Sequence, residues 1–373
     1  MKTLKIAMIL TNGFDPDPRV YKEAKSLVKL GHNVEILCWD RESKYKDTPE
    51  ELLDGIVIKR FFGEAQYGTG YKQGFKFLSF KKDVLDYMMH HHFDAIHCHD
   101  FDGLFIGYSI NKKLKLKLVY DEHDLFYMYF ADRPGKLNKI IYNFIISWEK
   151  MMLKNVDNHI VVTSEMKKLY ENISKSIYVV TNAPSKDIFR DIAKTPSNKL
   201  RIGYIGSVRY LEELKILADI SQKFEEKIEV IISGRGIALD ELKEYCKGYD
   251  NIKITGAYSF SDLENLYKNT DITYAFYPSR ISSISMPNKF YESIITETPI
   301  IANKFMEFGR EVEKHKLGYA IDEENLELDL EKAILELISD DSKVEYFKNQ
   351  MKAIKEDYLW EANERRLSEI YSK

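Results

Sequence analysis

The sequence predicts an α/β protein made of two Rossmann-like domains, each with a doubly wound parallel sheet, that face each other across a cleft. The chain has 373 residues, which is more than a single hydrophobic core usually supports. Short apolar segments alternate with amphipathic helical segments through both halves, and this alternation is typical of parallel sheets. The pattern is interrupted near Thr181-Asn182-Ala183-Pro184-Ser185, so we expect domains at residues 1–183 and 184–355.

In the first half, we expect strands wherever a short apolar run is bounded by turn residues. These strands are Lys5–Leu10, Asn33–Leu37, Ile56–Arg60, Ala95–His97, Leu116–Tyr120, His159–Thr163 and Ile177–Val180. Segments with apolar residues at helical spacing separate them. The expected helices are Pro18–Leu30, Phe75–His91, Phe101–Asn111, Leu137–Asn155 and Glu165–Tyr170.

The second half repeats this alternation. The expected strands are Arg201–Ile205, Ile228–Ile232, Ile252–Thr255, Ile272–Phe276, Pro299–Ala302 and Gly318–Ala320. The expected helices include Leu211–Phe224, Leu239–Cys246, Phe260–Lys268, Asn288–Thr296 and Gly309–His315. Strands separated by one helix each indicate that the second half also forms a parallel sheet.

Residues capable of chemistry follow several of the expected strands. They are Gly13 and Arg19; His97, His99 and Asp100; Asp121 and His123; Gly206 and Arg209; and Gly234. Open α/β sheets bind their ligands beyond the carboxyl ends of the strands. We therefore expect a ligand site at these loops.

The segment from Pro287 to Glu292 combines features that suit a nucleotide diphosphate. Pro287 and Asn288 stand at the expected start of a helix, where free backbone N–H groups attract anions. Lys289 adds a positive charge, and Glu292 lies nearly one turn further along, where a carboxylate accepts hydrogen bonds from a sugar diol. A buried helix with an incidental lysine is the alternative.

The glycines at the strand ends do not form a dinucleotide fingerprint. Gly203-Tyr204-Ile205-Gly206 lacks the G-x-G-x-x-G spacing, which argues against an NAD-linked dehydrogenase. Gly206 with Arg209 instead suggests a tight turn from which an arginine reaches a diphosphate. Gly234 marks a second turn of close approach, with ordinary turn chemistry as the alternative.

His123 lies between carboxylates in Asp121-Glu122-His123-Asp124, directly after an expected buried strand. At this position an imidazole donates to a substrate hydroxyl or transfers a proton near neutral pH. His97 and His99 share a strand face, but the spacing specifies no third metal ligand. We expect contacts with a ligand from His99 and Asp100, and no metal.

Composition and charge narrow the class of protein. The net charge of −4 argues against a nucleic-acid binder. Cys38, Cys98 and Cys246 are odd in number and widely spaced, so we expect reduced core thiols. The N-terminal apolar run is too short for a signal peptide, and we expect a cytoplasmic protein. Residues 59–82 are rich in basic and aromatic side chains, which suits peripheral binding to an anionic membrane on its inner face; a loop over the core is the alternative.

Together these motifs resemble a GT-B glycosyltransferase of family 4, the retaining "group 1" family. The resemblance extends over nearly the whole chain. It is carried by Asp17-Pro18-Arg19-Val20, His97-x-His99-Asp100, Val119-Tyr120-Asp121-x-His123-Asp124, Val180-Thr181-Asn182-Ala183-Pro184, Thr255-Gly256-Ala257-Tyr258, Pro287-Asn288-Lys289-x-x-Glu292 and Leu359-Trp360-Glu361.

The resemblance implies transfer of a sugar from a nucleotide diphosphate-sugar to a cell-envelope glycan or a lipid-linked acceptor, without a cofactor or metal. Residues 1–183 would bind the acceptor, residues 184–355 the donor, and a last helix at 356–373 would return to the first domain. The implied catalytic residues are His123, Arg209 and Lys289. The implied donor-binding residues are Gly13, Gly206, Arg209, Gly234, Tyr258, Pro287, Asn288, Lys289 and Glu292, and the acceptor-side residues are Arg19, His99, Asp100 and Asp121.

The chain departs from the family pattern at three positions. The first glutamate of the E-x7-E motif falls at Ile284, and the usual Arg and Lys after the Gly206 strand fall near Ser207 and Glu212. Arg209 and Lys289 are the expected replacements. A GT-B sugar-nucleotide epimerase and a non-catalytic partner subunit are the alternatives, and Ile284 favours the latter.

Overall fold

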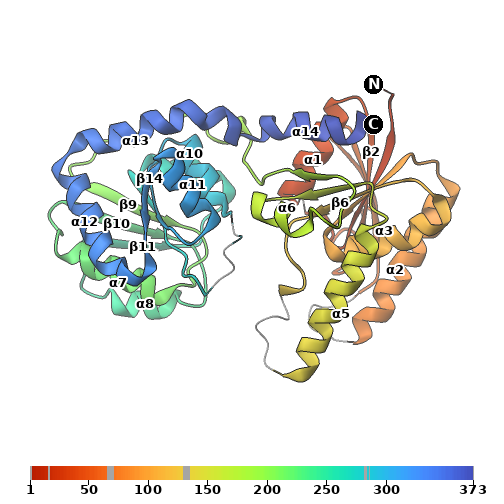
Figure 1. Ribbon diagram of the computed structural model, residues 1–373, viewed down its shortest axis with the longest axis horizontal. Coiled ribbons are helices and arrows are strands. Elements are labelled where there is room, and N and C mark those ends of the chain that lie inside the picture. Colours follow the sequence, from red (N-terminus) through yellow and green to blue (C-terminus); the bar gives the residue numbers. More distant parts are fainter. Residues whose placement is uncertain are drawn as a thin grey trace. The chain divides into compact units, whose positions relative to one another are not determined.

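The computed structural model of the protein describes residues 2–15, 17–64, 71–128, 135–280, 284 and 286–372. The chain divides into two compact units (Figure 1). The first comprises Met1–Thr181 together with Asn363–Lys373, and the second comprises Asn182–Ala362. Each unit contains its own sheet with helices packed on it, as predicted.

The first unit is built on an eight-stranded sheet in the order β3-β4-β2-β1-β5-β6-β7-β8. The strands are β1 (Lys5–Leu10), β2 (Asn33–Asp40), β3 (Glu50–Leu53), β4 (Ile56–Phe62), β5 (Ala95–His99), β6 (Lys117–Glu122), β7 (Asn158–Val161) and β8 (Ile177–Val179). The helices are α1 (Pro18–Lys29), α2 (Tyr71–His90), α3 (Asp100–Leu114), α5 (Lys136–Leu153) and α6 (Ser164–Tyr170). Strand β1 is buried almost throughout, as a central parallel strand covered on both faces must be.

Strand β3 is an edge strand that the sequence patterns did not predict. It pairs antiparallel with β4, so the first sheet is parallel except at this edge. Asp54 and Gly55 join the two strands with φ angles of +49° and +83°, and an Asp-Gly pair with positive φ is typical of a two-residue hairpin loop. The charged Glu50 and Glu51 are exposed, which is why no apolar run marks the strand.

The second unit contains a six-stranded sheet in the order β11-β10-β9-β12-β13-β14, and all its strand pairs are parallel. The strands are β9 (Leu200–Ile205), β10 (Ile228–Ser233), β11 (Ile252–Gly256), β12 (Ile272–Ala275), β13 (Ile300–Asn303) and β14 (Gly318–Ile321). The helices are α7 (Leu211–Gln222), α8 (Leu239–Tyr245), α9 (Leu263–Lys268), α10 (Asn288–Ile295), α11 (Glu307–His315), α12 (Leu326–Ser339) and α13 (Asp341–Ile354).

The core of the second unit explains where its ligand loops lie. Apolar side chains from β9, β10 and β12 pack against α7 and α12, while α10 packs on β12 and β13. Strands β10, β9 and β12 are neighbours at the centre of the sheet. The loops that follow them therefore meet at one edge.

The last helix, α14 (Trp360–Ser372), contributes to both units, because the boundary falls between Ala362 and Asn363. The Asn363 side chain donates to the Thr181 carbonyl oxygen at 3.1 Å. Tyr371 is buried within the first unit. None of the described helices has the length and apolar content needed to cross a membrane.

Candidate functional site

Lys289 is a buried cation at the start of α10 in the second unit. Its side chain is only 4% exposed, and among the described residues its ammonium group has no hydrogen-bond partner. The ammonium nitrogen lies 3.8 Å from the centre of the Tyr204 ring and 5.2 Å from that of Tyr277. Burial lowers the pKa of Lys289 to about 7, although the charge of Glu292 opposes this effect. An unpartnered buried ammonium is costly, and an anion would satisfy it.

Gly206, directly after β9, lies against this ammonium. A Cβ atom on Gly206 would stand 3.3 Å from Lys289 Nζ, and its φ of +139° favours glycine. Gly234 follows β10 and approaches more closely still, because a Cβ there would lie 1.7 Å from the Gly206 carbonyl oxygen. The two loops thus pack backbone to backbone, with Gly206 against Lys289, and the predicted close approach of a ligand to these turns stays a prediction.

Arg209 lies further along the Gly206 loop and is exposed. Its Nε donates to Ser207 Oγ at 2.8 Å. The positive charge of Arg209 acts on the Tyr204 hydroxyl, and Tyr204 is also the ring on which Lys289 rests. Both cations thus act on Tyr204, Arg209 through its charge and Lys289 through contact with the ring.

Glu292 lies on α10 one turn beyond Lys289. Its Oε2 accepts a hydrogen bond from the Tyr267 hydroxyl at 3.0 Å, and its charge also acts on the half-buried Tyr258. Burial is the stronger cause, and together with that charge it raises the pKa of Tyr258 to about 12. The Glu292 carboxylate thus acts on both Lys289 and Tyr258.

Pro287 is the residue that precedes the first turn of α10, with an extended backbone and no side-chain cap. The first backbone N–H groups of an α-helix have no partner within the helix. Asn288 is exposed, and its side-chain oxygen accepts from Asn182 Nδ2 at 2.9 Å. Ile284 is described, but residues 281–283 and 285 beside it lie outside the described part of the chain.

A second polar cluster lies in the first unit around Asp121, at the end of β6. Arg19 Nε and Nη2 donate to the two oxygens of Asp121 at 3.0 and 2.6 Å. His99 Nδ1 lies 3.1 Å from Asp121 Oδ2, and His123 Nε2 also bonds to that oxygen. Asp17 caps α1 by accepting from the backbone N–H of Arg19, which fixes the start of the helix that carries the arginine.

His123 carries a positive charge in this cluster at neutral pH. Burial opposes that charge, but Asp121 and Asp100 outweigh burial and raise the pKa of His123 to about 9. The Asp100 carboxylate lies 3.6 Å from His123 Nδ1 and accepts from the His123 backbone N–H at 3.3 Å. Asp100 itself has a φ of +56°, a strained backbone of the kind found at functional sites. A charged imidazole donates hydrogen bonds and does not accept a proton.

Exposure separates the residues of this cluster into two groups. Arg19, His99 and Asp121 are buried, whereas the His123 and Asp100 side chains are 18% and 44% exposed. The assignment of Arg19, His99 and Asp121 to the acceptor side stays a prediction, and their burial favours a positioning role. They hold His123 in place, and His123 and Asp100 present the surface.

Two members of the cluster were not assigned to the site from the sequence, namely Glu23 on α1 and Tyr371 on α14. Glu23 Oε2 lies 3.3 Å from His97 Nε2, and its Oε1 lies 3.1 Å from Arg19 Nη2. Burial raises the pKa of Glu23 to about 8. The Tyr371 hydroxyl lies 2.9 Å from His97 Nδ1. The spacing of Arg19 and Glu23, four residues apart on one helix, was the available signal for Glu23.

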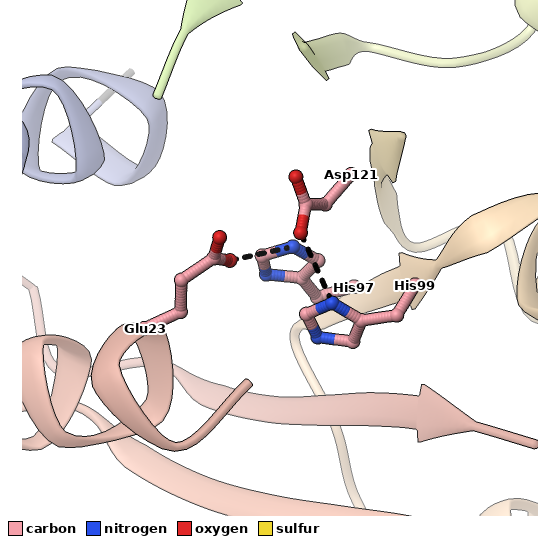
Figure 2. Close-up of side chains that lie close together, drawn as sticks. All are labelled: Glu23, His97, His99 and Asp121. Carbon is pink, nitrogen blue, oxygen red and sulfur yellow. Dashed lines mark hydrogen bonds and ion pairs between the residues drawn. The ribbon is translucent and has the colours of Figure 1, made fainter. Parts of the chain in front are cut away.

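Figure 2 shows Glu23, His97, His99 and Asp121, whose possible ligand atoms lie within 4.8 Å of one another. A metal ion needs such a set of donors, but Arg19 already contacts both carboxylates. A divalent cation there would face the guanidinium charge at close range. The residues present therefore fit a network of fixed charges better than a metal site, and the expectation that no metal is needed stays a prediction.

Gly13 lies in the first unit, while the other expected donor-binding residues lie in the second. Its carbonyl oxygen accepts from Arg60 Nε at 3.2 Å. Arg60 is buried and also binds the Thr48 carbonyl oxygen and the Glu51 carboxylate. Arg60 is thus a structural residue, and its inclusion in the membrane surface expected at 59–82 is corrected.

Phe80 is likewise buried, with its ring stacked on that of Trp39. Its inclusion in the membrane surface expected at 59–82 is therefore also corrected. Residues 65–70 of the segment lie outside the described residues. Phe75 and Lys76 are exposed. Only part of the segment 59–82 is therefore available to a membrane.

The geometry leaves one group of candidate residues in each unit. Gly206, Arg209, Gly234, Tyr258, Pro287, Asn288, Lys289 and Glu292 lie in the second unit, and Arg19, His99, Asp100, Asp121 and His123 lie in the first. The second-unit group combines two cations, close backbone turns, a helix N-terminus, a carboxylate and an aromatic ring. This combination suits a diphosphate attached to a nucleoside.

Two family models match most of the chain. Residues 19–183 match the family model described as "Glycosyltransferase Family 4". Residues 199–340 match the model described as "Glycosyl transferases group 1". A curated protein, the succinoglycan biosynthesis protein ExoL of Rhizobium meliloti (strain 1021), is 26% identical over 138 residues. That match covers 35% of this chain and only 34% of ExoL, about a third of the relative's length.

Solved structures share the fold along the whole chain. Sucrose-phosphate synthase from Thermosynechococcus elongatus has a TM-score of 0.77 at 16% identity, covering 99% of this chain and 98% of that one. HepE from Anabaena, in complex with UDP and glucose, has a TM-score of 0.69 at 13% identity, covering 99% of this chain and 100% of that one. At such identities the likeness shows the fold alone.

Proposed function

The chain belongs to the group 1 glycosyltransferases of family 4, and we propose that it transfers a sugar from a nucleotide diphosphate-sugar to a cell-envelope glycan or a lipid-linked acceptor, with retention of configuration. The GT-B fold and the glycosyltransferase class follow from the family. The donor, the acceptor and the stereochemistry are the proposal. Membership in this family favours an enzyme over a non-catalytic partner subunit.

The buried ammonium of Lys289 carries the proposal. It lies under Gly206 without a hydrogen-bond partner among the described residues, and burial holds its pKa near 7. The desolvation cost of such a group is recovered only when an anion reaches it. A diphosphate at the start of α10 would supply that anion and would also accept from the helix N–H groups.

The remaining residues of the second unit have roles that fit the rest of a nucleotide-sugar. Arg209 is exposed and its planar fork suits a phosphate. Glu292 would accept hydrogen bonds from the ribose, and Tyr258 would pack on the base. Gly206 and Gly234 keep the backbone close to the ligand. Pro287 and Asn288 begin the helix whose N-terminus faces the phosphates.

Departure of the nucleoside diphosphate leaves negative charge on its terminal phosphate. Fixed cations aimed at developing charge lower the barrier without reorganising during the reaction. Arg209 and Lys289 would supply those cations, so the chemistry assigned to them requires no metal or cofactor. The residues of the second unit would thereby form the donor domain, residues 184–355.

In the first unit His123 is the residue proposed to contact the reacting sugar or the acceptor hydroxyl. Its partly exposed imidazole carries a proton held by Asp121 and Asp100. It would therefore act as a hydrogen-bond donor and not as a base at neutral pH. Residues 1–183 would form the acceptor domain, with Arg19, His99 and Asp121 as positioning residues and Asp100 at the surface.

The comparisons suggest the first ligands to test. The structure of HepE contains UDP and glucose. UDP and UDP-glucose are therefore tested first, in a panel that also includes ADP-sugars, GDP-sugars and other sugar nucleotides. ExoL is described as a succinoglycan biosynthesis protein, which favours a polysaccharide acceptor. We propose a cytoplasmic enzyme whose exposed residues within 59–82 contribute to contact with an anionic membrane face; no nucleic-acid partner is proposed.

A thermal-shift panel followed by a transfer assay tests the proposal. A ligand that binds the folded state raises its apparent stability by mass action. At least one nucleoside diphosphate is expected to stabilise the protein, and the matching sugar nucleotide is expected to release nucleotide only when acceptor is present. Release that requires no acceptor, together with a changed sugar, would identify an epimerase instead. Stabilisation by no nucleotide would overturn the donor site.

A further inference from the structure

Helix α5 of the first unit exposes a row of large apolar side chains. Leu137, Ile140 and Phe144 are 69%, 65% and 60% exposed. At about 100° per residue these three side chains fall within roughly 60° of one another, and Met151 falls on the same stripe. Single exposed apolar residues need no explanation, but a contiguous exposed stripe marks an interaction surface.

The charges around this stripe are of one sign. Lys136, Lys139 and Lys150 are exposed on α5, and they lie along one edge of the apolar row. Glu149 is the acidic residue of this fully described helix, and it is buried, where it accepts from the Tyr120 hydroxyl at 3.1 Å. The solvent-facing side of α5 is therefore apolar and basic, with no exposed carboxylate.

The apolar surface continues onto the neighbouring helices. Figure 1 shows α2, α3 and α5 next to one another in the first unit. Phe105 on α3 lies between Phe77 on α2 and Trp148 on α5, with ring centres 5.7 and 5.0 Å away. Trp148 in turn contacts Phe144 at 5.3 Å. Phe75 on α2 is also strongly exposed.

Helix α12 of the second unit offers an internal contrast. Leu328 and Leu335 are 56% and 50% exposed, so α12 also presents apolar side chains to solvent. Each of them is adjacent to an exposed glutamate, Glu327 or Glu336. Lys332 also lies between the two leucines and pairs with Asp329 at 3.4 Å. The exposed apolar residues of α12 thus stand among charges of both signs, and those of α5 among lysines alone. An anionic surface would attract only the second arrangement.

We propose that the α5 face, defined by Leu137, Ile140, Phe144 and the flanking lysines, is the docking surface of this protein for an anionic phospholipid bilayer. The apolar stripe enters the boundary between headgroups and acyl chains, and the lysines remain at the headgroups, as in an interfacial amphipathic helix. The positive edge selects anionic lipid. This surface is separate from the segment 59–82, and the inference does not depend on the proposed transfer reaction.

Co-sedimentation of the full-length protein with vesicles tests the docking surface. One set of vesicles contains phosphatidylcholine alone, and the other contains phosphatidylglycerol in addition. The double variant I140E/F144E is compared with L328E/L335E, which makes the same two changes of charge on α12. Wild type and L328E/L335E are expected to bind the anionic vesicles, whereas I140E/F144E is expected to bind at least tenfold more weakly.

Tryptophan fluorescence provides a second readout that reports on α5 itself. Of the three tryptophans, Trp39 and Trp360 are buried, whereas Trp148 on α5 is half-buried. Brominated anionic lipid is expected to quench the wild-type signal on binding. The same lipid is expected to leave the signal of W148F unchanged while that variant still co-sediments, which places the quenched ring on α5.

Several results would overturn the proposal. They are undiminished binding of I140E/F144E, equal binding of wild type to neutral and anionic vesicles, or quenching that persists in W148F. A wild-type dimer that I140E/F144E converts to a monomer would assign the face to self-association instead. Circular dichroism and nucleotide-induced thermal stabilisation of I140E/F144E show whether its fold is intact. Failure of nucleotide to stabilise even wild type would count against the donor site and leave the lipid result unaffected.

Discussion

Replacing Lys289 by methionine should make the protein more stable and at the same time remove its response to nucleotide. The ammonium is buried without a hydrogen-bond partner among the described residues, and its pKa is about 7 instead of 10.5. At 1.36 kcal/mol per pH unit this difference corresponds to a destabilisation on the order of 4 kcal/mol near pH 7. The contact of the ammonium group with the Tyr204 ring offsets about 1–2 kcal/mol of this destabilisation.

Methionine has a similar volume and contacts aromatic rings favourably. We therefore expect Lys289→Met to raise the free energy of unfolding by about 1–3 kcal/mol. Each kcal/mol should raise the Tm by roughly 2–4 °C. The folded pKa is below the unfolded one, so the unfolded chain binds more protons between pH 7 and 10.5. The destabilisation by Lys289 is fully present below pH 7 and fades as pH rises towards 10.5. The advantage of the variant should shrink accordingly.

Lys194 provides the matched control, because burial lowers its pKa to about 7 as well. Its ammonium group, however, donates to the Tyr267 carbonyl oxygen at 2.9 Å and to Thr298 Oγ1 at 2.6 Å. Lys194→Met also removes a buried ammonium, but it loses these two hydrogen bonds, so it should stabilise the protein less than Lys289→Met does. It should keep the nucleotide response. The assays are urea unfolding and thermal shift with and without UDP or the nucleotide selected by the panel. A Lys289→Met protein that is less stable than wild type, or one that the nucleotide still stabilises fully, would refute the reasoning.

Three further predictions concern other residues of the two groups. Gly234→Ala should lower the free energy of unfolding by about 3 kcal/mol or more, since its Cβ would lie 1.7 Å from the Gly206 carbonyl oxygen. Gly248→Ala, at φ +91° in open space, should lower it by only about 1 kcal/mol. Equal urea midpoints for the two variants would contradict this prediction. His123→Gln should lower the free energy of unfolding by at most about 3 kcal/mol below pH 6.5, and this loss should vanish as pH rises through about 9. A loss of stability that is constant with pH would contradict a protonated His123. Arg209→Ala should reduce kcat/KM, because about 2–4 kcal/mol of transition-state stabilisation is lost. Near-normal turnover would exclude Arg209 from the site.

The regular parts of the fold could be predicted from the sequence because each strand of a covered parallel sheet is a short apolar run. Lys5–Leu10 is such a run, and the structure confirms its bounds. Strand β3 was missed because it is exposed and charged. The Asp54-Gly55 pair between β3 and β4 was its signal, since this dipeptide is typical of hairpin loops. Helices α12 and α13 were likewise not assigned.

The site could be predicted only as far as sheet topology carries. Strand order places the loops after β9, β10 and β12 at one edge of the second sheet, where Gly206 and Gly234 were expected, while their approach to a ligand stays a prediction. No spacing rule indicates that Lys289 is buried, because lysine is almost always exposed. Its burial arises from the packing of α10 against the rings of Tyr204 and Tyr277.

In the first unit, contacts between residues far apart in the sequence limit how much of the site could be predicted. Tyr371 reaches His97 across most of the chain, and no local pattern relates these two residues. Arg60 was taken for a surface cation because it stands in a basic segment. Its hydrogen bonds to the carbonyl oxygens of Gly13 and Thr48 depend on the folded loops after β1 and before β3.

Titration calorimetry with UDP, or with the nucleoside diphosphate selected by the panel, tests most directly whether Lys289 receives the phosphates. At pH 8 a lysine with a pKa of about 7 is mostly neutral, and an adjacent diphosphate raises that pKa. Measurements in two buffers of different ionisation enthalpy should therefore show uptake of about one proton per nucleotide bound by wild type, and none by Lys289→Met. Binding to wild type without proton uptake, or equal uptake by the variant, would contradict the donor site described above.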